Sequence, residues 1–277
     1  MTDQTTSEIA TYFRVCDGTR VRYADTEGLR KQTIVLTSPW PESLYAFTPI
    51  WATLSEHARL FAVDLPGFGA SERRDKLLAP RAMGAFLARL VTEVGLDRPH
   101  IVAPDVGTAA ALFAAADNPG LFASLTVGAG GTKVPIQLGE PLASWVLDPD
   151  IGKYRTMDPR ATVSAALDTI PGGLPNDIRS DYLDCYDGDR FVESMKYVRT
   201  YPRELPVLAR LLPRIGTPVT IIAGRNDHAV PLANAEFLHE LLPAGRLVIL
   251  DAGHFAWEEV PTAYASAIAD TVSATAT

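Results

Sequence analysis

The stretch HIVAPDVGTAAAL, residues 100–112, places a single acid between an apolar run typical of a strand and an alanine-rich run typical of a helix. Ala103 stands two residues before Asp105, and Gly107 stands two residues after it. Small residues at those two positions leave room for a sharp strand-to-helix turn that exposes the acid. Two interpretations of Asp105 are open: a helix cap that accepts backbone N–H groups, and a nucleophile at the turn.

The rest of the chain repeats this alternation of strand and helix. Short apolar runs, most of them rich in β-branched residues, alternate with longer segments of helical period, which is typical of a parallel sheet covered by helices on both faces. The expected strands are residues 12–16, 21–24, 33–37, 60–64, 100–103, 124–127, 219–223 and 247–250, the first two forming a hairpin. The expected helices are residues 80–94, 106–116, 233–242 and 263–274. The sequence therefore predicts an α/β fold.

Between residues 131 and 215 the strand pattern stops. This segment consists of polar, aromatic and proline-punctuated helical pieces such as SAALDTI, DIRSDYLDCY and RFVESMKYVRTY. Because long structureless loops are rare in compact domains, a segment of this length predicts an inserted helical cap. The expected division is a core of residues 1–130 and 216–277 and a cap of residues 131–215.

Composition narrows the classes of protein to which the chain can belong. Its 277 residues are enough for one large core, and its net charge of −8 repels both nucleic acid and anionic lipid. The only cysteines are Cys16 and Cys185, which disfavours a disulfide framework and indicates a reducing compartment. The beginning of the chain lacks the pattern of a secretory signal, and no apolar run is long enough for a membrane span. We therefore expect a soluble, cytoplasmic protein with a small-molecule substrate, and we leave open whether it forms a homodimer.

Two further residues lie at strand ends in the same way as Asp105. Asp227 follows the run VTIIA in GRND, and His254 follows the run LVIL in DAGHF. The chain order is thus nucleophile, acid, histidine, with each residue just beyond the carboxyl end of a predicted strand. Open α/β sheets bind ligands at that edge, so we expect the three side chains to meet there.

With these residues the chain resembles the α/β-hydrolase family over nearly its whole length. SPWPES, residues 38–43, is similar to the family segment H-G-x-P followed by Glu-Ser, and PGFGASE, residues 66–72, is similar to its G-x-small-x-Ser turn. The resemblance implies an α/β-hydrolase fold, with a mostly parallel eight-stranded sheet flanked by helices and an inserted helical cap. An aspartate at the turn is similar to the family's epoxide hydrolases and haloalkane dehalogenases, whereas its esterases and lipases carry serine.

The aspartate decides which reaction we expect. A carboxylate is ionised at neutral pH and attacks an electrophilic sp³ carbon without first losing a proton, which gives an alkyl ester on Asp105. His254, supported by Asp227, then takes a proton from water, and the resulting hydroxide cleaves the ester at its carbonyl carbon.

The resemblance also implies where the oxyanion of the second step is bound. The family places the two donors at backbone N–H groups, which here belong to Trp40 and Val106. Ser38 and Pro39 stand where the family carries His-Gly, and proline fixes φ near about −65° where glycine is free. The loop before Trp40 therefore departs from the family pattern.

The cap has to supply a group that stabilises the leaving oxygen. Its tyrosines are Tyr154, Tyr182, Tyr186, Tyr197 and Tyr201. The resemblance to epoxide hydrolases implies that one of them protonates the epoxide oxygen, and MKYVRTY, with Tyr197 two residues before Arg199, is similar to the segment that carries it. We expect Tyr197 to be the acid and Trp40, Tyr186 and Tyr154 to bind substrate. In a dehalogenase the indole N–H of Trp40 would instead bind halide.

These features together predict a capped hydrolase that opens small apolar epoxides to diols, with Asp105, His254, Asp227 and Tyr197 as catalytic residues. A haloalkane dehalogenase with the same triad stays open, as do a biosynthetic lyase or cyclase and a ligand-binding member of the fold. No Cys/His cluster has zinc spacing, no acidic loop suggests calcium, and PGFGASE lacks the lysine of a phosphate-binding loop. We therefore expect neither a metal nor an organic cofactor.

Overall fold

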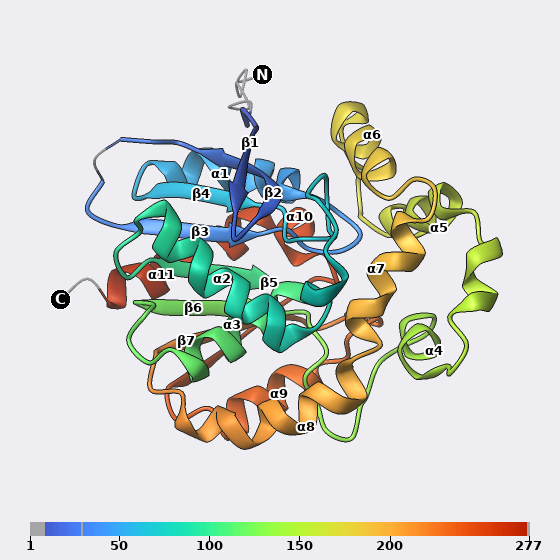
Figure 1. The fold of residues 1–277 in the computed structure, drawn as a ribbon. Coiled ribbons are helices and arrows are strands. Elements are labelled where there is room, and N and C mark those ends of the chain that lie inside the picture. Colours follow the sequence, from blue (N-terminus) through green and yellow to red (C-terminus); the bar gives the residue numbers. More distant parts are fainter. Residues whose placement is uncertain (1–8, 29, 276–277) are drawn as a thin grey trace.

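An eight-stranded sheet runs through the residues that the computed structural model describes, 9–28 and 30–275 (Figure 1). The strand order is β1-β2-β4-β3-β5-β6-β7-β8, and all neighbours are parallel except the pairs β1–β2 and β2–β4. The strands are β1 (Tyr12–Cys16), β2 (Thr19–Asp25), β3 (Thr33–Thr37), β4 (Arg59–Val63), β5 (His100–Pro104), β6 (Ser124–Gly128), β7 (Val219–Gly224) and β8 (Gly245–Leu250). The mostly parallel eight-stranded sheet predicted from the sequence is confirmed, with strand ends shifted by at most two residues.

Helices cover both faces of this sheet. α2 (Pro80–Val94) and α3 (Val106–Asp117) pack together in front of it in Figure 1, and α1 (Thr48–Ser55) and α11 (Pro261–Ala274) pack together behind it. α9 (Ala233–Leu241) packs on β7 and β8. All four helices expected from the periodicity are present, so the chain builds the layered α/β architecture.

The sequence did not predict α1. This helix follows a 3₁₀ turn at Leu44–Phe47 and buries Ile50, Trp51 and Leu54. A helix of eight residues spans little more than two turns, so its apolar period is too short to stand out from the surrounding sequence.

Residues 131–215 form a helical layer beside the carboxyl ends of the strands, at the right of Figure 1. Its elements are α4 (Leu142–Leu147), η3 (Gly152–Thr156), α5 (Pro159–Leu167), α6 (Asn176–Cys185), α7 (Arg190–Val198), α8 (Tyr201–Leu211) and η4 (Leu212–Arg214). α8 packs against α3, the helix that begins after Asp105. The cap therefore lies over the edge of the sheet where the three candidate catalytic residues follow their strands.

A charged network joins the cap to the core. Nε of Arg22 on β2 donates to Asp64 Oδ2 at 2.7 Å, and Nη1 of Arg22 donates to Asp181 Oδ1 on α6 at 2.5 Å. Ser43 Oγ donates to the second oxygen of Asp181 at 2.6 Å. Because one planar guanidinium binds carboxylates from both layers, this network fixes the position of α6 over the core.

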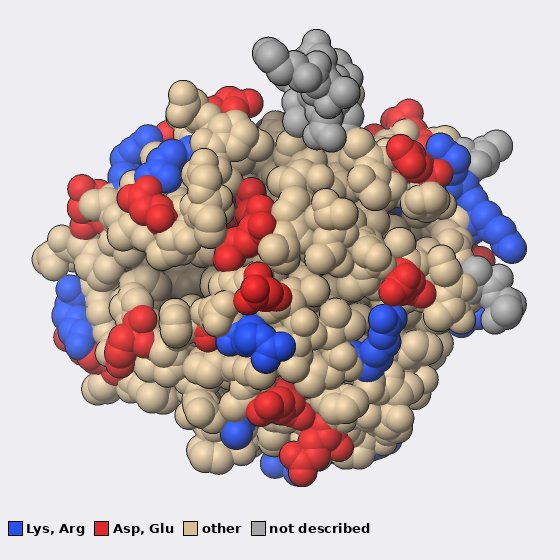
Figure 2. All heavy atoms as spheres, turned by 180° about the vertical axis from the view of Figure 1, so that it is seen from behind, with Lys and Arg blue, Asp and Glu red and all other residues tan. Residues whose placement is uncertain are grey.

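The surface carries charges of both signs. Acidic and basic side chains are interspersed on the face turned away from the view of Figure 1 (Figure 2). Arg81 pairs with Asp117 and Arg246 pairs with Asp270, exposed contacts of the kind that add little to stability. Among residues 9–28 and 30–275 no helix is long and apolar enough to cross a membrane.

The turn between β5 and α3 has an unusual backbone. Asp105 has φ 51° and ψ −121°, a left-handed conformation that non-glycine residues seldom adopt. A Cβ atom on Gly107 would lie 2.3 Å from Thr37 Oγ1, and one on Gly130 would lie 2.4 Å from the backbone oxygen of Asp105. The small residues around Asp105 are therefore required by the close approach of β3 and of the segment after β6.

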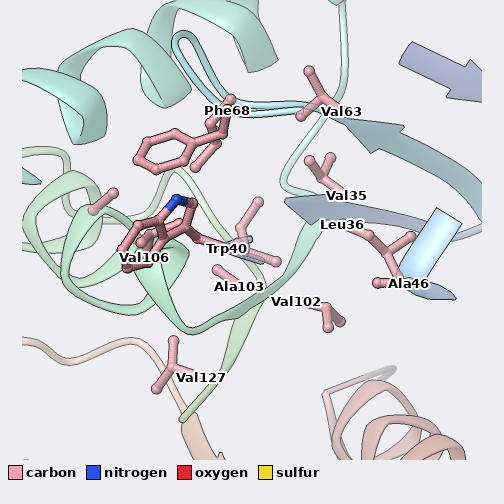
Figure 3. Packing of buried hydrophobic residues seen from close by; sticks show 14 of the residues in the cluster. Val35, Leu36, Trp40, Ala46, Val63, Phe68, Val102, Ala103, Val106 and Val127 are labelled. Carbon is pink, nitrogen blue, oxygen red and sulfur yellow. The ribbon is translucent and has the colours of Figure 1, made fainter. Parts of the chain in front are cut away.

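Apolar side chains pack closely around this turn. In Figure 3 Ala103 of β5 and Val106 of α3 flank the turn, and the rings of Trp40 and Phe68 lie beside Val106. All four are at most 6% exposed. Charges at the turn therefore interact in surroundings of low polarity, where electrostatic effects are stronger than in water.

Gly107→Ala tests the packing of the turn. The added methyl group meets Thr37 Oγ1 and the Cβ of Ala103, so we expect the free energy of unfolding, measured by urea denaturation, to fall by about 1–3 kcal/mol. Gly216→Ala, at a position with open space around the Cβ, should change it by less than about 0.5 kcal/mol. Combining Gly107→Ala with Thr37→Ala should restore most of the loss, and an additive double variant would contradict this account.

Candidate active site

Asp105 does not use its carboxylate to cap α3. A cap would bind the N–H of the second or third helical residue, and no such hydrogen bond is formed. Instead, Oδ2 accepts the backbone N–H of Trp40 at 2.6 Å, and the backbone N–H of Val106 further stabilises the ionised carboxyl. The cap interpretation is therefore wrong, and the carboxylate lies in the space between core and cap.

Trp40 and Val106 place two backbone donors at one negatively charged group. Such donors are the usual means of stabilising an oxyanion in acyl transfer. Pro39 leaves the N–H of Trp40 free, and the hydroxyl of the buried Ser38 accepts a backbone N–H from the segment after β4. The Ser38-Pro39 pair therefore does not prevent the arrangement that the family pattern implies.

His254 and Asp227 form a hydrogen-bonded pair. His254 Nδ1 lies 2.8 Å from Asp227 Oδ2, and because an ionised carboxylate only accepts, Nδ1 carries the hydrogen. Asp227 Oδ1 accepts the backbone N–H groups of Ala229 at 2.9 Å and Val230 at 2.7 Å. The carboxylate is thus held at both oxygens, and Nε2 of the imidazole is left for chemistry.

The charges of the three residues are linked. Burial raises the pKa of Asp105 to about 6, against the opposing effects of the His254 charge and the Trp40 amide. For His254, burial acts to lower the pKa, but the carboxylates of Asp227 and Asp105 outweigh it and raise the pKa to about 9. At neutral pH the site therefore holds an ionised Asp105 beside an imidazolium.

Two cap tyrosines lie against the turn. Tyr197 is fully buried, and its hydroxyl donates to the backbone oxygen of Val106 at 2.7 Å. Tyr201 packs against Gly131, and burial together with the charge of Asp105 raises the pKa of its hydroxyl well above the usual value. The hydroxyl of Tyr197 is therefore engaged by the backbone, whereas Tyr201 is a cap tyrosine near Asp105 whose position the sequence did not distinguish.

The other residues expected to bind substrate use their polar groups elsewhere. Trp40 Nε1 donates to Ser194 Oγ on α7 at 2.9 Å. The hydroxyl of Tyr186 donates to the backbone oxygen of Glu42 at 2.9 Å, and that of Tyr154 donates to a backbone oxygen within the cap at 3.1 Å. The structure therefore brings Trp40 to Asp105, while the hydroxyls of Tyr186 and Tyr154 join segments of the protein to one another.

An aromatic cluster continues from Trp40 into the cap. The ring of Trp40 stacks on Phe191 with centroids 5.2 Å apart, and Trp145 meets both rings edge-on. Phe191 and Trp145 come from α7 and α4, so the cap supplies most of this cluster. The wall next to the oxyanion donor is therefore apolar.

Three glutamates near the site were not predicted from the sequence. Glu259 binds the histidine loop, because its Oε2 accepts the N–H of Gly253 at 2.7 Å and its Oε1 accepts the N–H of Phe255 at 3.0 Å. Glu42 follows the loop of residues 38–41 that carries Trp40 (the oxyanion loop), and Glu258 follows the loop of residues 251–255 that carries His254 (the histidine loop). Their closeness in sequence to Trp40 and His254 is the one signal that points to them.

The geometry combines a charged nucleophile, a histidine supported by a carboxylate, and two backbone donors. These are the groups that covalent catalysis followed by hydrolysis requires. Within the described part of the chain no group of three His, Cys, Asp or Glu side chains is placed to hold a metal ion. The carboxylate, the imidazole and the two backbone donors are groups that an acyl or alkyl transfer uses.

Comparison with known proteins agrees with this architecture. The model of the "Alpha/beta hydrolase family" matches residues 35–267, most of the chain. The solved structure of the epoxide hydrolase CorEH superposes with a TM-score of 0.81 at 21% identity, covering 96% of this chain and 99% of that one. At that identity the likeness shows the fold alone.

Two curated relatives differ in the reactions that their names describe. A 2-hydroxy-6-oxononadienedioate/2-hydroxy-6-oxononatrienedioate hydrolase from Paraburkholderia phymatum is 28% identical, covering 93% of this chain and 95% of its own length. A soluble epoxide hydrolase from Corynebacterium sp. is 30% identical over 44% of this chain and 42% of its own length.

Replacing Asp227 tests the charge coupling. In Asp227→Asn the negative charge beside Nδ1 is lost, so we expect the pKa of His254 to fall from about 9 by on the order of 2 units. A histidine pKa that is raised on folding stabilises the folded state at low pH, and this stabilisation is lost as the pH rises through about 9. The variant should therefore be less stable than the wild-type protein mainly below that pH. NMR titration of the imidazole resonances measures the pKa, with the exposed His239 as an internal control. An unchanged His254 titration would contradict the coupling.

Proposed function

The chain belongs to the alpha/beta hydrolase family, and from this premise we propose that it hydrolyses small apolar epoxides to diols through an alkyl ester on Asp105. The observation that carries the proposal is an ionisable carboxylate, rather than a hydroxyl, at the strand-to-helix turn with one oxygen on the Trp40 amide. A carboxylate there is suited to attack on an sp³ carbon.

In the first step a carboxylate oxygen of Asp105 forms a bond to an epoxide carbon. The carbon–oxygen bond of the ring breaks, and its electron pair stays on the leaving oxygen. Since burial leaves the pKa of Asp105 at about 6, the nucleophile is ionised at neutral pH. The departing oxygen needs a proton, because an alkoxide is a far stronger base than the phenolate that a tyrosine becomes when it gives up its proton.

We assign that proton to Tyr201. Tyr201 lies near enough for the charge of Asp105 to act on its hydroxyl, which stays protonated at neutral pH because burial raises the pKa of the phenol. The Tyr197 hydroxyl already donates to the backbone of Val106, so Tyr197 supports the ring of Tyr201, whose centroid lies 6.0 Å away. This assignment replaces Tyr197 as the acid expected from the sequence.

Ester formation changes the charge of His254. The negative charge of Asp105 contributes to the raised pKa of the imidazolium, and the neutral ester no longer does so. The imidazolium of His254 then transfers its proton to the Tyr201 phenolate, which leaves a neutral imidazole and a neutral phenol. The base needed for the next step is thus produced by the first step itself.

In the second step Nε2 of His254 takes a proton from water, and the hydroxide attacks the ester carbonyl carbon. The backbone N–H groups of Trp40 and Val106 stabilise the oxyanion. Its collapse breaks the bond between the carbonyl carbon and the alkyl oxygen, and the proton of the attacking hydroxide passes to that oxygen, which releases the diol and restores the carboxylate of Asp105 beside the imidazolium. One epoxide and one water give one diol, so atoms and charges balance.

The aspartate also separates this proposal from the reaction named for the dienedioate hydrolases. Cleavage beside a carbonyl group requires attack on an sp² carbon, and a carboxylate that attacks it forms a reactive anhydride. Attack on an epoxide carbon forms a stable ester instead. The aromatic wall of Trp40, Phe191 and Trp145 favours an apolar epoxide over a dianionic substrate.

A haloalkane dehalogenase uses the same first step but needs donors for the halide. The indole N–H of Trp40, which the sequence offered for this purpose, donates to Ser194 Oγ. Val106 provides no side-chain donor. A tyrosine hydroxyl near Asp105 fits a leaving oxygen better, so epoxides are the preferred substrates.

Isotope transfer tests the covalent step. A single turnover of excess enzyme with styrene oxide in ¹⁸O water should place label in the peptide that contains Asp105, because the hydroxide enters at its carbonyl carbon. Mass spectrometry of that peptide gives the result. Turnover without label in Asp105 would show that the aspartate acts only as an acid or base.

His254→Gln provides the matching trap. At alkaline pH, where Asp105 is ionised without the imidazolium, the variant should still be alkylated but should not hydrolyse the ester, so the intact protein gains the mass of the epoxide. Asp105→Asn should gain none. If the epoxide leaves the mass of His254→Gln unchanged while wild-type enzyme turns it over, the ester mechanism is excluded.

Two tyrosine variants test the acid. Tyr201→Phe should lower the alkylation rate by at least about 10²-fold, the usual effect of removing a general acid, whereas Tyr197→Phe should lower it by a few-fold at most. Stopped-flow measurement of alkylation in the His254→Gln background separates this step from hydrolysis. The reverse order of effects would return the role to Tyr197.

A further inference from the structure

Two glutamates meet beside the active site with no cation between them. Glu42 lies two residues after Trp40 and is fully buried, and Glu258 lies on α10 (Ala256–Glu259), four residues after His254, and is partly buried. Within residues 9–28 and 30–275 neither carboxyl forms an ion pair with Lys or Arg. Two carboxylates this close repel each other strongly away from water.

The hydrogen bonds around the two carboxyls leave one donor missing. Trp257 Nε1 donates to Glu42 Oε2 at 2.9 Å, and the hydroxyl of Tyr182 donates to Glu258 Oε1 at 3.0 Å. Glu42 Oε1 is buried without any partner among the ordinary donors of the described residues. Glu258 follows Trp257 in the chain, so the bond from Trp257 to Glu42 brings the two carboxyl groups together, and a proton on one of them fills the gap.

The surroundings favour retention of that proton. The titratable groups that act on the pair are Asp105 from the core and Tyr182 from α6, and the hydroxyl of Tyr186 at the end of α6 donates to the backbone oxygen of Glu42. Burial and the neighbouring Glu258 raise the pKa of Glu42 well above its usual range, and burial raises that of Glu258 to about 7. Above about pH 7 the pair therefore carries one proton and one negative charge, until Glu42 also ionises at higher pH.

The pair connects three segments that form the active site. Glu42 belongs to the loop that presents the Trp40 amide to Asp105, and Glu258 belongs to the helix that follows His254. From the cap, Tyr182 reaches the Glu258 carboxyl, and Tyr186 donates to the backbone oxygen of Glu42. A change in the protonation of the pair therefore affects the oxyanion donor, the histidine loop and α6 together.

We propose that Glu42 and Glu258 are positioning residues that share one proton. The hydrogen bond made by this proton stabilises the packing of cap helix α6 against the oxyanion and histidine loops. Loss of the proton at alkaline pH places two negative charges side by side and leaves Glu42 Oε1 without a donor. The pair then separates, α6 loosens, and the Trp40 amide moves away from Asp105. The consequence for catalysis rests on the proposed function, whereas the shared proton and the fastening of the cap do not.

Glu258→Gln is the sharpest test, because glutamine keeps the shape and supplies an N–H donor that does not titrate. Hydrogen exchange of the backbone amides of α6, corrected for the intrinsic effect of pH, is measured at neutral and at alkaline pH. In the wild-type protein we expect exchange of the α6 amides to become about tenfold faster at alkaline pH, the change that corresponds to one pKa unit of lost stabilisation by the shared proton. In Glu258→Gln we expect no such change. Equal pH dependence in both proteins would overturn the proposal.

Infrared difference spectra between neutral and alkaline pH observe the proton directly. The wild-type protein should lose the carbonyl band of a protonated carboxyl, and Glu258→Gln should lack this change, while the exposed Glu240→Gln should behave as wild type. Absence of the band from the wild-type spectra would overturn the proposal. Glu258→Ala, which removes the second carboxyl of the pair and the acceptor of the Tyr182 hydroxyl, should show fast exchange of α6 even at neutral pH.

The pH profile of kcat/KM connects the pair to the reaction. We expect activity of Glu258→Gln to persist to higher pH than that of the wild-type enzyme, with a ratio of rates that grows to about tenfold per pH unit beyond the wild-type limb. Identical alkaline limbs would overturn the positioning role. If epoxides are not substrates at all, the exchange and infrared results still decide the shared proton, so failure of the proposed function is distinguishable from failure of this inference.

Discussion

A carboxylate that must remain charged in an apolar turn is the constraint on which the active site depends. Burial alone would protonate Asp105, and the imidazolium of His254 and the backbone amides of Trp40 and Val106 oppose this. These groups come from three separate loops at the carboxyl edge of the sheet. The order of β3, β5 and β8 in the sheet, and the close packing at Gly107, thus matter because they bring fixed dipoles and one positive charge to a single point.

The sequence predicted those parts of the molecule that depend on local pattern. The apolar runs gave the strands to within two residues, and small residues around Asp105 indicated the turn, because only they fit beside β3. The chain order of Asp105, Asp227 and His254 placed all three at one edge of the sheet. Strand periodicity and turn sterics are short-range properties, so a single sequence is enough to reveal them.

The direction of side chains in the cap could not be predicted in the same way. Tyr197 lies near the end of α7 and Tyr201 begins α8, both are buried near the charge of Asp105, and only the backbone oxygen of Val106 distinguishes them by engaging Tyr197. Glu42 and Glu258 are separated by more than 200 positions, and nothing local in SPWPES or AWEEV indicates that their carboxyls meet. These contacts depend on how cap and core are docked, which is a long-range property.

Charge balance explains why the cap and the catalytic residues are best understood as one unit. The carboxyls of Asp227, Asp105 and Glu259 act on the imidazolium of His254, and Glu42 and Glu258 add two more carboxyls beside Asp105. Two backbone amides compensate the negative charge of Asp227, and the amides of Trp40 and Val106 compensate that of Asp105. Among the described residues Glu42 accepts only the indole N–H of Trp257. A proton kept between the glutamates removes the surplus charge with no added cation. A positively charged side chain there would compete with His254 for Asp105 and lower the pKa of both, so the acid pair compensates the glutamates while leaving the imidazolium as the only cation near the nucleophile.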